Sequence, residues 1–160
     1  MASSKLLPLR AAFAILALPG VVAGVIPWWI QRGTERWPLE VGGFNWLGLL
    51  VFLPAFILFS WTVRDFFVKG QGTLAPWDPP KALMAEGVYG WSRNPMYVGV
   101  VGMIWGQGVW FRSGEVLAYG ALIAVIFHLR VLLGEEPWLA RTFPEPWAAY
   151  KQKVKRWGLF

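Results

Sequence analysis

The sequence predicts an all-α integral membrane protein with about four transmembrane helices, and three observations support this fold class. Of its 160 residues, 56% are hydrophobic and only 15% are charged, whereas soluble domains have about 25% charged residues. The mean hydropathy is +0.46. The chain also has 12 Trp and 11 Phe, and Trp gathers where hydrocarbon meets lipid headgroups. A core of this size cannot hold so many apolar side chains, so we expect many to face lipid.

Intervals without an ionised residue predict where the chain crosses the membrane. Three of them approach the ~20 residues that a helix needs to cross ~30 Å of hydrocarbon. They are residues 11–31, 41–63 and 94–111. The fourth interval, residues 116–129, is long enough only if its helix continues to Gly134, which places Arg130 inside that helix. We expect the third and fourth helices to form a hairpin.

The first interval has two interpretations. Lys5 and Arg10, followed by an apolar run, resemble the start of a secretory signal peptide. The run continues to Ile30, however, and ends in Trp28 and Trp29, which suit the membrane interface. We therefore expect a retained transmembrane helix.

The distribution of Lys and Arg predicts the orientation, because short cytoplasmic loops carry an excess of both. If the N-terminus is cytoplasmic, that side holds twelve of the fifteen, and the C-terminus is cytoplasmic as well. The opposite side holds Arg32, Arg36 and Arg112, offset by three Glu residues. The net charge of +6 then lies wholly on the cytoplasmic face. Attraction to anionic membrane lipids accounts for this charge, and no nucleic-acid-binding signature accompanies it.

The spans also predict the domain organisation. We expect a single membrane domain over residues 1–160, with two transmembrane helices in residues 1–63 and the functional part in residues 64–160. Residues 65–94, between the second and third spans, are rich in Gly and Pro. At about thirty residues this segment exceeds the 2–8 residues usual between packed helices, which favours a functional loop over a plain connector.

Polar and aromatic residues gather where the third helix begins. Pro95 suits its first position, and Asn94 suits the N-cap, where its side-chain oxygen can accept a bond from a free backbone N–H. Tyr89, Arg93 and Tyr97 flank this point. A helix N-terminus offers N–H donors and positive dipole to an anionic group, so these residues form a candidate ligand site.

The third helix also carries Gly102 and Gly106, a small-xxx-small pattern that lets two helices approach closely. We expect these glycines to pack against the fourth helix. The alternative is that they leave room for a ligand beside the backbone.

Ionisable residues follow at the end of the fourth span. Arg130, taken alone, is expected to extend to the headgroups. Glu135 and Glu136 are costly at this depth unless they are paired or solvated, which makes them functional candidates. His128 is expected to be hydrogen-bonded or interfacial.

A basic amphipathic helix is predicted near the C-terminus, beginning at Pro146. Its apolar stripe consists of Trp147, Tyr150 and Val154, and four Lys and Arg residues form its charged side. Such a helix suits the surface of the cytoplasmic leaflet.

The composition excludes several kinds of chemistry. With no Cys and one His, the chain has no disulfide framework, no thiolate nucleophile and no multi-histidine metal site. We expect no bound metal. A Ser-His-Asp triad would need His128, and no GxSxG motif accompanies it. Metal-free or cofactor-dependent chemistry remains.

An ordered set of residues resembles the isoprenylcysteine carboxyl methyltransferase and phospholipid methyltransferase superfamily of integral membrane enzymes. The resemblance covers roughly residues 70–157. It rests on Gly87-Val88-Tyr89, on Arg93-Asn94-Pro95-Met96-Tyr97-Val98-Gly99, on Glu135-Glu136, and on Leu139, Phe143, Tyr150, Val154 and Arg156-Trp157.

The resemblance implies an enzyme that binds S-adenosylmethionine at the cytoplasmic side and releases S-adenosylhomocysteine. A lipophilic or prenylated acceptor would enter from the bilayer between helices. Arg130 and Glu136 are the candidate catalytic residues. The candidate cofactor-binding residues are Leu83, Met84, Tyr89, Arg93, Asn94, Pro95, Met96, Tyr97 and Glu135.

Three departures from the family pattern bear on the acceptor. Asn94 stands where the family often has His and cannot act as a general base, which favours a carboxylate acceptor such as a prenylated cysteine over an amine. Against a prenylcysteine, Val131 stands where the eukaryotic enzymes carry an Arg, and Arg130 lies one residue earlier. Pro144 replaces the usual Gly. A phospholipid amine is the alternative acceptor, and a non-catalytic four-helix assembly or transport subunit is the alternative outside the enzymes.

Overall fold

The computed structural model describes residues 16–33, 44–69 and 83–158, and every regular element in these ranges is a helix. The α-helices are α2 (Ile26–Arg32), α3 (Phe44–Lys69), α4 (Pro95–Phe111), α5 (Gly114–Arg130), α6 (Glu136–Thr142) and α7 (Pro144–Lys153). Two π-helical segments, η2 (Leu16–Val25) and η4 (Val131–Glu135), precede α2 and α6, and η3 (Gly87–Gly90) is a 3₁₀ helix. For the described residues, the all-α prediction is confirmed.

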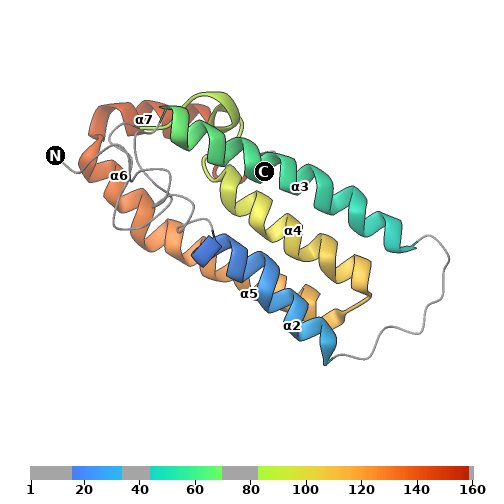
Figure 1. Cartoon of the computed structure of the whole chain (residues 1–160). Coiled ribbons are helices and arrows are strands. Elements are labelled where there is room, and N and C mark those ends of the chain that lie inside the picture. The colour runs from blue at the N-terminus through green and yellow to red at the C-terminus, as the bar shows by residue number, and fades with distance from the viewer. Residues whose placement is uncertain (1–15, 34–43, 70–82, 159–160) are drawn as a thin grey trace, which may run out of the picture.

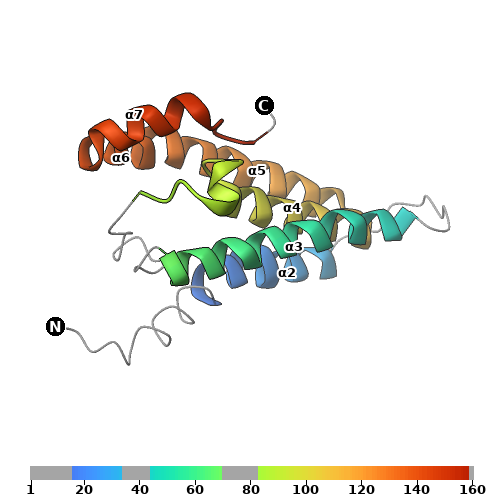
Figure 2. The ribbon, with the colours of Figure 1, turned by 90° about the horizontal axis from the view of Figure 1, so that it is seen from above.

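Helix α4 lies at the centre of the bundle (Figures 1 and 2). It packs against α3 on one side and α5 on another, and η2 and α2 pack against α4 and α5. The buried core therefore follows α4, with Val100, Met103 and Ile104 among its members. Among the described residues, α3 and α5 also carry large apolar side chains that are exposed, on surfaces that do not contact α4.

Gly102 and Gly106 of α4 face α3, so the expectation that they would pack against the fourth helix is wrong. A Cβ atom at Gly102 would lie 2.7 Å from the Ala55 side chain, and one at Gly106 would lie 2.7 Å from Phe52. Close approach to α5 is made instead by Gly108, whose Cβ would lie 2.5 Å from Leu117. The small-residue pattern predicts a close helix contact but does not identify the partner.

Side chains from α4 and α5 donate hydrogen bonds to two backbone carbonyls that precede Pro27 in the sequence. This proline lacks the N–H that would bond to a carbonyl one turn earlier. Gln107 of α4 donates to the Ala23 carbonyl at 2.6 Å, and Tyr119 of α5 donates to the Val22 carbonyl at 3.0 Å. Proline is tolerated in a membrane helix when neighbouring side chains satisfy the freed backbone groups in this way.

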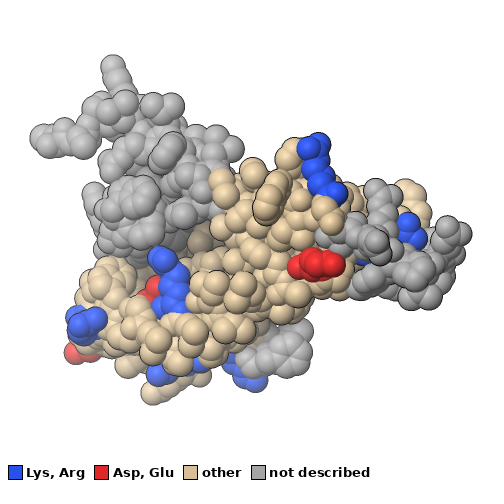
Figure 3. Space-filling model, turned by 90° about the horizontal axis from the view of Figure 1, so that it is seen from below, with Lys and Arg blue, Asp and Glu red and all other residues tan. Residues whose placement is uncertain are grey.

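Two helical stretches are long and apolar enough to cross a membrane, Asn45–Asp65 and Gly114–Thr142. Many large apolar side chains on them are exposed, including Leu50, Ile57 and Leu133. Figure 3 shows a face on which much of the described surface carries no charge. These helices support a membrane location. The count of four spans and the positions of the two termini stay predictions.

The helix boundaries differ from the predicted spans in two places. Helix α3 continues beyond residue 63 to Lys69, because an uncharged interval marks apolar sequence and not the end of a helix. The fourth span continues past Arg130 as expected, but it does not end at Gly134. Its helical stretch runs through η4 and α6 to Thr142. A π-helical turn at Val131–Glu135 accommodates this continuation.

Helix α7 begins at Pro144, two residues before the predicted start. The predicted apolar stripe is buried, but against protein. Trp147, Tyr150 and Val154 pack with Leu83, Leu139 and Phe143. The stripe therefore does not face lipid, because α6 and the segment before η3 cover it. The placement of this helix at the cytoplasmic leaflet stays a prediction.

Candidate functional site

The predicted polar residues meet at one end of the bundle, where η3 and the N-terminus of α4 adjoin η4, α6 and the C-terminal segment, residues 154–158 (Figure 2). Residues far apart in the sequence come together here through hydrogen bonds and ion pairs.

The C-terminal segment is bound to the start of α4. The side-chain amide of Asn94 donates to the Arg156 carbonyl at 3.1 Å, and the Ser92 hydroxyl donates to the same oxygen at 3.2 Å. The backbone N–H of Arg93 donates to the Lys155 carbonyl at 3.0 Å. Asn94 does occupy the N-cap position, but its side chain makes no capping bond. The expected cap is therefore wrong, because the amide is oriented toward the C-terminal segment.

Aromatic contacts extend this attachment. Gly158 has a φ of +85°, and a Cβ there would lie 3.0 Å from the Trp91 ring. The indole N–H of Trp157 donates to His128 Nδ1 at 3.3 Å. His128 is thus hydrogen-bonded, as predicted, and it connects the end of α5 to the C-terminal segment.

Glu136 forms a buried ion-pair cluster with two arginines. Arg156 donates to both of its oxygens, at 2.7 and 2.9 Å, and Arg93 Nη1 lies 3.0 Å from Oε1. The side chains of Glu136 and Arg93 are only 10% and 8% exposed. The Arg93 guanidinium also lies 5.2 Å from the Trp147 ring centre. Burial lowers the pKa of Arg93, whereas the bonds to Glu136 raise the pKa of Arg156. This cluster joins α6 to the segment between η3 and α4 and to the C-terminal segment.

Glu135, the adjacent residue, belongs to a second and more open cluster. The Tyr97 hydroxyl donates to Glu135 Oε1. Arg130 Nε donates to the same carboxylate oxygen at 2.8 Å and to the Tyr97 hydroxyl at 3.1 Å. The Glu135 side chain is 34% exposed and that of Arg130 is 48% exposed. Tyr97 also stacks on Phe127, with 4.3 Å between ring centres. The cluster combines a carboxylate, a cation and an aromatic ring at an accessible position.

Tyr89 and Tyr150 lie side by side behind these clusters. The Tyr150 hydroxyl donates to the Tyr89 carbonyl at 2.7 Å, and both side chains are buried. Burial raises the pKa of Tyr150 to about 12. Burial also raises the pKa of Tyr89, and the nearby carboxylates Glu135 and Asp65 raise it further.

The remaining predicted residues make no polar side-chain contact that the structure describes, and their part in cofactor binding stays a prediction. Leu83 contacts the buried stripe of α7, and Met84 beside it is half-buried. Pro95 is fully buried, and Met96 packs against the core. The predicted residues that the structure brings into polar contact at this end are Arg93, Asn94, Tyr97, Arg130, Glu135 and Glu136.

Sequence reasoning missed two residues of this region. The charged side of the predicted C-terminal helix includes Arg156, but its place in the family pattern is a signal for a further role. Asp65 lies in the last turns of α3 and is 3% exposed. Its position directly after an apolar span was the only signal for it.

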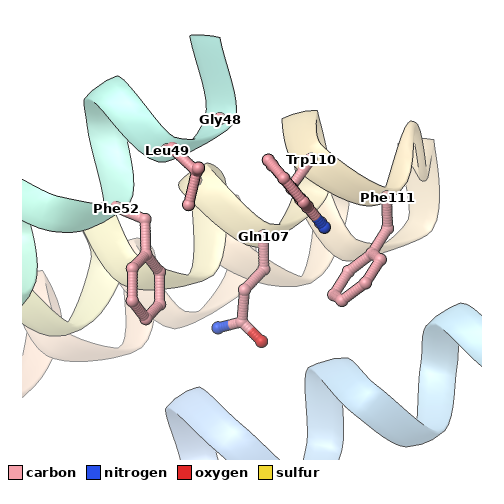
Figure 4. A pocket seen from close by; sticks show the side chains of 7 residues that line it. Gly48, Leu49, Phe52, Gln107, Trp110 and Phe111 are labelled. Atoms are coloured by element: carbon pink, nitrogen blue, oxygen red, sulfur yellow. The ribbon is translucent and has the colours of Figure 1, made fainter. Parts of the chain in front are cut away.

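A small apolar cavity of about 130 Å³ lies at the other end of α4 (Figure 4). Phe52 of α3 and Gln107, Trp110 and Phe111 of α4 line it. These α4 residues lie twelve or more positions after Pro95, or about 18 Å along the helix. The cavity is therefore separate from the polar clusters.

The chain was compared with known proteins. A sequence profile described as phospholipid methyltransferase matches residues 45–146, which is more than half of the chain. The match begins in α3 and includes η3, α4, α5 and α6, and thus every residue of the two polar clusters except Arg156. No curated protein matches, and no solved structure matches.

Proposed function

The chain belongs to the phospholipid methyltransferase family, and from this premise we propose that it transfers a methyl group from S-adenosylmethionine to a lipophilic acceptor. Membership of the family and the two apolar helices support a membrane methyltransferase. The cofactor and the acceptor are the parts that we propose.

The observation that carries the proposal is the cluster of Tyr97, Arg130 and Glu135. S-adenosylmethionine supplies a methyl group that is already activated on a sulfonium cation. A carboxylate and aromatic faces are suitable partners for cationic groups. Glu135 is partly exposed and can therefore contact a bound ligand. Methyl transfer then requires alignment and exclusion of water more than acid–base chemistry.

Glu136 has a different task in this proposal. Its two oxygens are occupied by Arg93 and Arg156 and it is buried, so it is a positioning residue and not a group that contacts the acceptor. By holding α6 against the segment between η3 and α4, the Glu136 cluster fixes the neighbouring Glu135. Arg130 stays the candidate for contact with the acceptor, since its side chain is half exposed.

Two acceptor classes fit a lipophilic substrate. A carboxylate, as in a prenylated cysteine, is nucleophilic at neutral pH and needs no base, which suits Asn94 at the start of α4. A phospholipid amine must first lose a proton. We propose the carboxylate first and the amine as the alternative, with the acceptor entering from the lipid-facing side of the bundle.

Calorimetric titration of S-adenosylhomocysteine into the protein in nanodiscs tests the proposal. We expect the wild type to bind and Glu135→Ala to bind at least about tenfold more weakly, the equivalent of about 1.4 kcal/mol. Glu145→Ala, a change at an exposed position of α7, is the matched control and should bind like the wild type. No binding by the wild type would contradict the proposed function. Normal binding by Glu135→Ala would contradict the role of this residue alone.

A further inference from the structure

Asp65 is a buried acid, and one of its two carboxyl oxygens has no hydrogen-bond donor among the described residues. Its side chain belongs to the last turns of α3 and is 3% exposed, and its Oδ2 atom has no hydrogen-bond donor within the part of the chain that the structure describes. An ionised carboxylate is strongly disfavoured in such surroundings unless a cation or several donors compensate it. Glu136 illustrates the usual solution, since two arginines occupy its oxygens. Among the described side chains, none donates to Asp65 Oδ2.

The position of Asp65 connects it with the candidate site. The end of α3 packs against η3, which carries Tyr89. Burial is the main cause of the raised pKa of Tyr89, and Glu135 and Asp65 each add to it. Both carboxylates therefore act on one phenol, and the unpartnered oxygen belongs to the same end of the bundle as the cluster of Tyr97, Arg130 and Glu135.

The chemistry of the missing partner is that of a small cation. A metal ion would need several ligands, and the described residues contain no group of three His, Asp or Glu side chains that could hold one. A primary ammonium needs fewer, because it carries three N–H donors and can bond to one carboxylate and to neighbouring carbonyl oxygens. It also compensates the buried negative charge.

We propose that Asp65 binds the ammonium group of a ligand in this site. The inference rests on the proposed function, which offers two sources of that group. One is the α-ammonium of S-adenosylmethionine, and the other is the amine of a phospholipid acceptor such as phosphatidylethanolamine. In either case Asp65 is a binding residue that the family pattern quoted above does not include.

The experiment compares the wild type with Asp65→Asn in nanodiscs, because asparagine keeps the size of the side chain and removes its charge. Affinities are measured for S-adenosylhomocysteine and for its analogue without the α-amino group. If the cofactor supplies the ammonium, the variant binds S-adenosylhomocysteine at least about tenfold more weakly, and both proteins bind the analogue equally. If the acceptor supplies it, cofactor affinity is unchanged and KM for phosphatidylethanolamine rises about tenfold or more.

Thermal unfolding without ligand gives a second readout. Because a neutral amide is less costly to bury than an acid whose oxygen lacks a donor, we expect Asp65→Asn to unfold at a higher temperature than the wild type and to gain less stability from the ligand. Glu145→Gln, an exposed acid on α7, should change neither property.

Two results would overturn the inference. In the first, Asp65→Asn binds S-adenosylhomocysteine as tightly as the wild type does. In addition, its KM for phosphatidylethanolamine is unchanged, or the wild type does not methylate that lipid at all. This result would leave the proposed function standing, because the wild type would still bind the cofactor product. The second is a wild type that does not bind S-adenosylhomocysteine, which would overturn the proposed function and this inference together.

Discussion

Asn94 and Arg156 are 62 positions apart in the sequence, yet the side-chain amide of the first donates to the backbone carbonyl of the second at 3.1 Å. This bond fastens the C-terminal segment across the start of α4. The same segment supplies the Arg156 guanidinium to Glu136. The end of the chain is therefore part of the candidate site, and the site depends on a contact that forms only in the folded protein.

Replacing Asn94 tests this attachment. Asn94→Asp removes the N–H donor and places a carboxylate oxygen against the Arg156 carbonyl, so we expect faster amide exchange in residues 154–158 and about tenfold weaker binding of S-adenosylhomocysteine. Asn94→His is the control, because an imidazole N–H can keep the bond. Equal exchange and equal affinity in Asn94→Asp and the wild type would contradict the attachment.

The two adjacent glutamates should separate stability from binding. Glu136→Gln leaves the buried Arg93 and the partly exposed Arg156 with a neutral partner, and breaking a buried ion pair in this way costs about 3 kcal/mol. Glu135→Gln alters a more exposed pair, for which about 1 kcal/mol or less is expected, but it should weaken cofactor binding. Denaturant unfolding in detergent measures the first effect and calorimetric titration the second. Equal destabilisation by the two variants would show that Glu136 has no special structural role.

Gln107 gives a prediction outside the site. Gln107→Leu removes the donor that bonds to the Ala23 carbonyl, and a buried carbonyl left without a partner costs about 1–3 kcal/mol. The free energy of unfolding should fall by that amount, with no change in affinity for S-adenosylhomocysteine. Gln152→Leu, at an exposed position of α7, is the control. An unchanged free energy in Gln107→Leu would mean that this bond does not stabilise the fold.

The raised pKa of Tyr150 predicts how the free energy of unfolding changes at alkaline pH. An unfolded tyrosine has a pKa of about 10, and burial raises the pKa of Tyr150 to about 12 in the folded protein. Because the folded state holds the proton more tightly, its contribution to stability is complete below pH about 10 and is lost as the pH rises to about 12. Tyr89, whose pKa is also raised, acts in the same direction. Unfolding measured from pH 9 to 12 should show this loss, and Tyr150→Phe should show a smaller one.

Features that depend on residues close together in the sequence could be predicted from the sequence alone. Helices α3, α4 and α5 follow from uncharged apolar intervals, and Pro95 marks the start of α4 because proline suits a first helical position. Most residues of the polar clusters could be singled out from the start of a helix, from ionisable groups at the end of a span and from the family resemblance, whereas the role of Arg156 could not. Features that depend on distant partners could not be predicted. The Asn94 amide has a capping partner nearby in sequence but bonds to Arg156, and Gly102 could face any neighbouring helix. That Asp65 Oδ2 is buried without a hydrogen-bond donor can be seen only in the folded structure, where α3 packs against η3.

The predicted orientation can be tested because the chain has no cysteine. The stretch Gly114–Thr142 is about 43 Å long at ~1.5 Å per residue, which exceeds the ~30 Å of hydrocarbon. Residues at its two ends should therefore lie on opposite sides of the membrane. In Glu115→Cys and Lys151→Cys, both at exposed positions, an impermeant maleimide should label the first from outside intact cells. The second should be labelled only in inverted vesicles, because the excess of Lys and Arg places the C-terminus in the cytoplasm. Labelling of both cysteines from one side would show that this stretch does not cross the membrane.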